Sequence, residues 1–177
     1  YILEYYRTIS DEKLAANVTS KEDLLSTLYY DFGTHSQNKF VADWFEFNLN
    51  INNLLTALAC RKHGFDIKQA IVGNNEVAKT IRTSNTHDFN LSGIFEPVEA
   101  IIAISENPNL LEREKAIDNL KWNWLEEHTF FNYFTIERVL AFYLRCELLH
   151  RWDNLTLENG QAIFRQLLED LKKDVKL

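Results

Sequence analysis

The sequence has few of the residues that break helices or cross-link chains. Its 177 residues include five Gly and two Pro, so turns are few and helices can be long. Cys60 and Cys146 lie far apart and outside any C-x-x-C pair. This excludes a disulfide framework and a cysteine zinc site, and it indicates a reducing compartment. Methionine is absent and the chain begins inside a predicted helix, so we expect further sequence before residue 1.

Basic runs and long apolar runs are also missing. The formal net charge is −7, and the only basic grouping is Arg61-Lys62-His63, which argues against a nucleic-acid partner. The longest apolar run, residues 98–104, is broken by Glu99, so we expect no segment that spans a bilayer. The start of the chain has no features of a secretory signal.

What the sequence does contain predicts an all-α fold with one long spine helix. Hydrophobic residues make up 46% and aromatic residues 13% of the chain, a composition typical of a folded protein. The spine helix is expected from Asn38 to His63, with Gly64 as its C-terminal stop. Nine residues at helical spacing form its apolar stripe: Phe40, Val41, Trp44, Phe45, Phe47, Ile51, Leu54, Leu55 and Leu58.

Shorter helices are expected on both sides of the spine. Ser20 begins one as an N-cap, and Gly33 is the predicted stop. Inward positions of the later helices are predicted at Leu111, Ile117, Leu120, Trp124, Leu125, Val139, Leu140, Tyr143, Leu144 and Leu148. The further predicted helices are 66–72, 75–83, one opened by Pro97, 110–128, 136–155 with Thr135 as cap, and 157–173.

The polar stretch 84–92 is the predicted boundary between two lobes or a mobile loop. We therefore expect an N-terminal helical lobe over residues 1–84 and a C-terminal helical lobe over residues 85–177. One continuous domain is the alternative.

Two sequence patterns suggest metal chemistry, and both lack their context. Glu147-x-x-His150 has the spacing of a di-iron ligand pair, but no second copy exists. An HD-type metal phosphohydrolase using His63, His87, Asp88 and Asp118 is the alternative enzyme hypothesis, although Asp88 suits a turn cap. No Gly-rich phosphate loop is present. We predict no catalytic, cofactor-binding or metal residues.

Aromatic clusters favour an interaction protein. Trp122 and Trp124 are two residues apart and cannot share one helical face, so one of them is expected at a lobe junction or a partner surface. The same holds for Phe130 and Phe131, although aromatic residues also dominate cores.

The spine helix carries a pattern that resembles the C-type component (d-type in eukaryotes) of the rotor of V-type and A-type ATPases. The matching residues are Trp44-Phe45-Glu46, Asn50-x-x-Asn53-Leu54 and Arg61-x-x-Gly64. Asn50 stands where that family usually has Asp. A second match is Thr135-Ile-Glu137, Leu140-Ala-Phe-Tyr-Leu144 and Glu147-x-x-x-Arg151, in which Glu147 and Arg151 are predicted to pair at i, i+4.

The chain is also similar, over nearly its whole length, to a bacterial domain family of unknown function whose members tend to be encoded beside V-type ATPase genes. The stretches Leu120-Lys-Trp-x-Trp-Leu125 and Thr129-Phe-Phe-x-Tyr-Phe134 carry that similarity.

These resemblances imply a body of helical repeats on the cytoplasmic side, peripheral to the inner face of the cell membrane. They imply a non-catalytic adaptor whose partners are the central stalk and the membrane rotor ring of an ion pump, with no cofactor. A general helical scaffold is the remaining alternative. The candidate structural or interaction residues are Trp44, Glu46, Asn50, Asn53, Arg61, Trp122, Trp124, Glu147 and Arg151.

Overall fold

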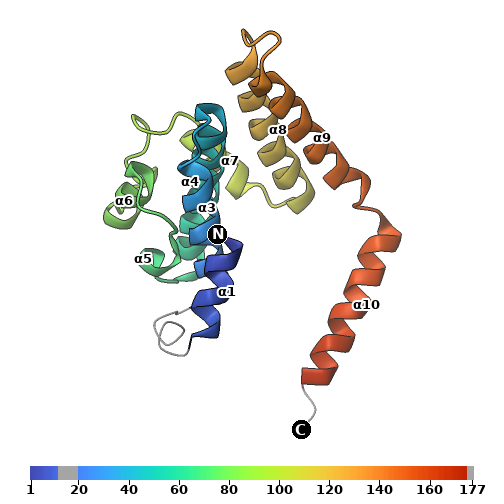
Figure 1. Cartoon of the computed structure of the whole chain (residues 1–177). Coiled ribbons are helices and arrows are strands. Elements are labelled where there is room, and N and C mark those ends of the chain that lie inside the picture. Colours follow the sequence, from blue (N-terminus) through green and yellow to red (C-terminus); the bar gives the residue numbers. More distant parts are fainter. Residues whose placement is uncertain (12–19, 175–177) are drawn as a thin grey trace. The chain divides into compact units, whose positions relative to one another are not determined.

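The described part of the chain, residues 1–11 and 20–174 of a computed structural model, is all-α (Figure 1). It contains nine helices and no strand, which confirms the predicted fold class at this level. The helices are α1 (Ile2–Ser10), α3 (Lys21–Thr34), α4 (Lys39–His63), α5 (Ile67–Ala70), α6 (Glu76–Thr83), α7 (Val98–Glu106), α8 (Leu110–Thr129), α9 (Ile136–Asp153) and α10 (Leu157–Asp174).

The chain divides into two compact units, Tyr1–Lys121 and Trp122–Leu177. The lobe boundary that the sequence predicts, between residues 84 and 85, lies inside the first unit. Within the described residues, no helix combines the length and the apolar character that crossing a bilayer requires.

Helix α4 is the spine of the first unit, as predicted. The Asn38 side chain caps its start by accepting a hydrogen bond from the Val41 N–H, and Gly64 ends it with a φ of 75°. Because a residue with a Cβ adopts that left-handed conformation only at a cost, glycine suits this position. Ile51, Leu54 and Ala57 on α4 are fully buried. Helices α3, α5, α6 and α7 all pack against α4.

The predicted stop at Gly33 is wrong, because α3 continues through it to Thr34. Gly33 is needed for a different reason. A Cβ at this position would lie 1.8 Å from Cδ1 of Phe45, so the glycine lets α3 approach the aromatic ring on α4. The predicted caps are confirmed: Ser20 accepts from the Asp23 N–H, and Thr135 accepts from the Arg138 N–H.

The polar stretch after α6 is irregular, as predicted, but it carries core residues. Phe89 and Leu91 are fully buried, and Phe95 and Val98 follow them into the core of the first unit. Phe89 and Asn90 adopt positive φ values of 54° and 57°. The stretch therefore packs as part of this unit even though it forms no regular helix.

The second unit leaves much apolar surface exposed. Arg138 of α9 donates to Thr129 at the end of α8, and residues 130–135 connect the two helices (Figure 1). Ala141 is the only buried residue among those described on α9. The predicted inward positions Val139 and Tyr143 are exposed, as is Leu111 at the start of α8. Helical spacing identifies an apolar stripe, but the stripe is buried only where another element covers it.

Candidate functional site

One polar face of α4 holds the segment that follows it. Asn53 lies in the middle of this face and is buried. Its amide nitrogen donates to the Val72 carbonyl over 2.8 Å, and its amide oxygen accepts from the Val72 N–H over 3.0 Å. One side chain thus pairs with both backbone groups of a residue 19 positions away. This arrangement satisfies polar groups that would otherwise be costly to bury.

Asn75 joins the same face to the start of α6. Its amide nitrogen donates to Asn50 Oδ1 over 2.8 Å and to Glu46 Oε1 over 3.0 Å. Its amide oxygen accepts from the Ala78 N–H and so caps α6. Asn50, where the resembling family usually has Asp, acts here as an acceptor for a neutral amide.

Arg61 holds the irregular stretch at the other end of α4. Its guanidinium donates to the carbonyls of Thr86 and His87 over 2.7 and 2.9 Å. The same group lies 3.8 Å from the centroid of the buried Phe89 ring, which is a cation–π contact. The two hydrogen bonds and the ring contact depend on the planar shape of the guanidinium as well as on its charge.

Four of the predicted candidates, Glu46, Asn50, Asn53 and Arg61, therefore meet one segment, residues 72–89. Their described contacts lie within the first unit, where they fix the backbone after α4. Trp44 is half-buried on the same helix, with its ring 6.3 Å from that of Phe47.

Sequence reasoning missed Arg82 as a further anchor of this segment. Its guanidinium donates to the carbonyls of Ile71 and Gly73 over 2.7 and 2.8 Å, and to Asn74 Oδ1 over 3.3 Å. A lone arginine on a short helix gives no sequence signal for such a role. The consequence is that Asn53 and Arg82 both hold the 71–74 backbone.

The tryptophans of the second unit have different neighbours. Trp122 is half-buried, and the guanidinium carbon of Arg145 lies 5.2 Å from its ring centroid. Trp124 stacks on His128 with 3.9 Å between ring centroids. The prediction that one of the two lies at a lobe junction or a partner surface stays a prediction.

The side chains of Glu147, His150 and Arg151 contact nearby residues of the same part of the chain. Glu147 forms a hydrogen bond with Tyr143 and raises the pKa of that phenol. Arg151 lies 5.6 Å from the Trp152 ring, and His150 contacts Asn154 through Nε2 over 3.0 Å. The predicted Glu147–Arg151 pair stays a prediction.

The residues of the alternative metal hypothesis have other contacts. The Asp88 carboxylate accepts from the Ser92 hydroxyl, the Asn90 N–H and the Thr86 hydroxyl, which hold its pKa well below the usual range. Asp88 thus acts as the turn cap that its position predicts. The His63 ring lies 6.1 Å from that of Phe65. Over the described residues, no group of three His, Cys, Asp or Glu side chains is placed to hold a metal ion.

Exposed apolar surface is the main feature of the second unit. The aromatic turn, defined as Phe130, Phe131, Tyr133 and Phe134, is exposed throughout. Helix α10 carries an exposed stripe at helical spacing: Leu157, Ile163, Phe164, Leu167, Leu168 and Leu171. Every α10 side chain that the structure describes is exposed. In the first unit, a smaller apolar groove of about 430 Å³ lies between α1 and α3 and is lined mainly by Tyr1, Tyr5, Tyr6, Leu25 and Tyr29.

Comparison with protein families gives one match. The family described as "Protein of unknown function (DUF2764)" matches residues 1–175. The chain belongs to the DUF2764 family. Comparisons with curated proteins and with solved structures found no match.

The DUF2764 match covers both the polar face of α4 and the exposed surfaces of the second unit. Its description names no activity and no partner. The two groups of candidate residues differ in what they do: the α4 residues hold their own chain, whereas the aromatic turn and α10 present apolar side chains to the surroundings.

Proposed function

We propose that this protein is a non-catalytic adaptor of a V-type ATPase, similar in role to the C-type (d-type) rotor component, which links the central stalk to the membrane rotor ring of a proton or sodium pump. The spine-helix pattern supplies the identity of the partners, by resemblance. In this proposal the chain acts by holding other proteins and carries out no reaction of its own.

The observation that supports an adaptor most strongly is α10. Most helices in proteins depend for their stability on packing of their apolar face. Helix α10 has 18 residues and six exposed large apolar side chains on one side. Contiguous exposed apolar surface is typical of a partner interface. The α10 stripe therefore supports a protein that completes its packing in a complex.

The polar face of α4 supports the same proposal in a second way. Its residues carry the resemblance to the ATPase rotor component, and in this structure they fix the segment after α4. A pattern that builds a rigid body is what an adaptor that transmits force requires. The proposal assigns the rigid body to the first unit and partner contact to the second.

The test is recovery of named partners from native membranes. The tagged full chain, purified in a mild detergent, is expected to bring down the stalk and ring proteins of the ATPase, identified by mass spectrometry. Ile163→Asp/Leu167→Asp places two charges on the α10 stripe and is expected to abolish that recovery. The proposal would be contradicted if the wild-type chain recovered neither the stalk proteins nor the ring proteins.

A matched control variant lies on the opposite side of the same helix. Ala162→Asp/Gln166→Asp has the same i, i+4 spacing and adds the same charge, but on the polar face. It is expected to recover the stalk and ring proteins at the wild-type level. Equal loss in both variants would show that added charge, and not the apolar stripe, disrupts the complex.

A further inference from the structure

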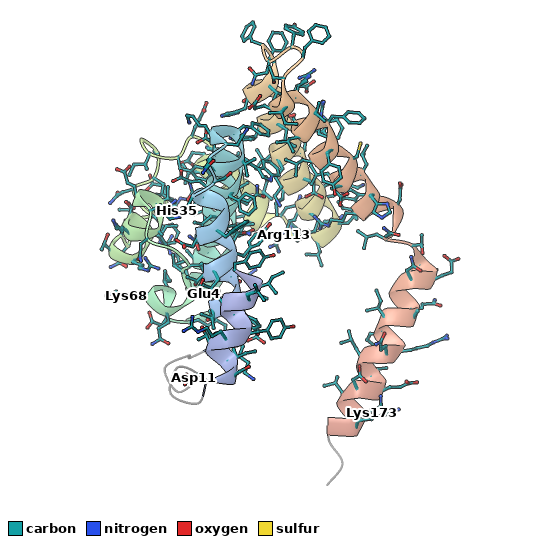
Figure 2. The ribbon with its side chains drawn as sticks, in the orientation of Figure 1. Glu4, Asp11, His35, Lys68, Arg113 and Lys173 are labelled. Atoms are coloured by element: carbon teal, nitrogen blue, oxygen red, sulfur yellow. The ribbon has the colours of Figure 1, made fainter. Side chains whose placement is uncertain are left out.

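The aromatic turn exposes four large aromatic residues at one place in the chain. The relative exposure of its residues is 56% for Phe130, 83% for Phe131, 66% for Tyr133 and 106% for Phe134. Figure 2 shows the side chains of this turn pointing away from the ends of α8 and α9. Large aromatic side chains bury much area in cores and interfaces. Because the four at this tip are exposed, covering them would be favourable.

The backbone under the turn is firmly held. Thr129 is buried, and its carbonyl and hydroxyl both accept from Arg138 Nη1, over 3.2 and 3.1 Å. Thr135 caps α9, and the rings of Phe130 and Phe131 meet edge to face at 4.8 Å. The turn is therefore a preorganised tip, which lowers the entropy lost when it is bound.

Phe134 has a backbone conformation that bulky residues rarely adopt. Its φ is 59°, in the left-handed region that favours Gly and Asn. Phe134 is fully exposed, so burial of its ring does not offset this strain. Glycine would suit the backbone better and expose less apolar surface. Departures of this kind from local preference are concentrated at functional sites.

The end of α8 departs from local preference in a second way. Glu126 and Glu127 are exposed in the last turn of the helix, next to the aromatic turn. A helix C-terminus carries partial negative charge, so carboxylates there are unfavourable. These two residues place an acidic rim beside an apolar tip.

We propose that the aromatic turn is an anchor that inserts into an apolar pocket with a basic rim on a partner protein. A rigid convex tip fits a concave site, and buried aromatic anchors dominate the affinity of many interfaces. The acidic rim complements basic residues around the pocket, and it is repelled by an anionic lipid surface. The identity of the partner, the stalk or the ring, rests on the proposed function.

The test measures equilibrium binding of the purified full chain to purified stalk proteins and to the purified ring. Phe131→Ala/Phe134→Ala is expected to weaken binding at least about thirty-fold, the loss typical of a strong interface anchor. The control is Phe65→Ala, which removes a similarly exposed ring from the first unit and is expected to bind as the wild type does. Glu126→Gln/Glu127→Gln is expected to reduce the salt dependence of binding.

Phe134→Gly separates binding from stability. It relieves the strained φ, so its melting temperature is expected to equal or exceed that of the wild type, while its affinity falls. A lower melting temperature would show that Phe134 stabilises the fold, which would overturn its role as an anchor. Loss of binding through misfolding is thus distinguishable from loss of the anchor.

The remaining outcomes decide between the two proposals. Wild-type binding that is unchanged in Phe131→Ala/Phe134→Ala would overturn the anchor and leave the adaptor function standing. Binding by the wild type to neither partner would overturn both. Co-sedimentation of the wild type, but not of this variant, with phosphatidylcholine–phosphatidylglycerol vesicles would show that the turn binds lipid, and that result also overturns the protein pocket.

Discussion

The side-chain amide of Asn53 forms hydrogen bonds with both backbone groups of Val72, at 2.8 and 3.0 Å. The bonds join the middle of α4 to the loop between α5 and α6, and Arg82 donates to the carbonyls of Ile71 and Gly73 in the same loop. The Asn53 side chain thus pairs with a backbone N–H and a backbone carbonyl, as a neighbouring strand does in a sheet. These polar contacts help to fix the position of the loop.

Replacing Asn53 with alanine is expected to destabilise the protein by about 2–3 kcal/mol, because it leaves the N–H and carbonyl of Val72 without these partners. The measurement is the free energy of unfolding in urea. Asn119→Ala changes an exposed asparagine on α8 and is expected to stay within about 0.5 kcal/mol of the wild type. Equal effects in the two variants would contradict a special role for Asn53.

Replacing Gly33 with alanine is expected to cost about 1–3 kcal/mol, because the added Cβ would lie 1.8 Å from Cδ1 of Phe45 and the ring or a helix must shift. Gly160→Ala is the control, since a Cβ there meets nothing within 4 Å and lies on the exposed helix α10. It is expected to stabilise α10 by up to about 1 kcal/mol. Circular dichroism during thermal unfolding measures both changes.

Replacing Arg61 with lysine is expected to destabilise the stretch 86–91 although the charge is retained. Lysine cannot reproduce the paired hydrogen bonds to Thr86 and His87 or the flat contact with Phe89. We expect a loss of about 1–2 kcal/mol and faster hydrogen exchange at the amides of this stretch. Lys62→Ala, at the adjacent exposed position, is expected to leave exchange there unchanged.

Asp88 makes stability depend on pH in the acidic range. Hydrogen bonds from Ser92, Asn90 and Thr86 lower its pKa in the folded state, so its contribution is fully present above the ordinary pKa of 3.8. That contribution is lost as the pH falls from this value through the lowered folded pKa. Asp88→Asn is expected to melt below the wild type at about pH 6, and the difference should shrink once the pH falls below the ordinary pKa. A difference that stays constant from about pH 6 to about pH 2 would contradict this assignment.

Much of the fold follows from local sequence. The start and end of α4 were predictable because Asn38, the apolar stripe and Gly64 act within a few residues of each other. The role of Gly33 was not, because a glycine suits a helix stop as well as a close approach. What decides between the two is Phe45, which lies on another helix.

The faces of α9 show a second limit. Periodicity places Val139 on the apolar side of the helix, but burial depends on whether a further element covers that side, and Val139 is exposed. No pattern within α9 contains that information.

The contacts of the candidate residues on α4 were not predictable from the sequence. Resemblance identified Glu46, Asn50, Asn53 and Arg61, but their partners lie 19 to 29 residues further along the chain. The aromatic turn was visible as a cluster of rings. Its exposure, and the positive φ of Phe134, required the backbone.

The hydrogen bonds of Asn53 and Asn75 also limit how this chain can change in length. Both tie the segment after Gly64 to fixed positions on α4, so inserting or deleting a residue between Gly64 and Val72 would move Val72 away from the Asn53 amide. Gly93 is different, because it is exposed in a turn and a Cβ there meets nothing within 4 Å. Among DUF2764 chains, we therefore expect length variation near residue 93 and a constant number of residues between positions 53 and 75.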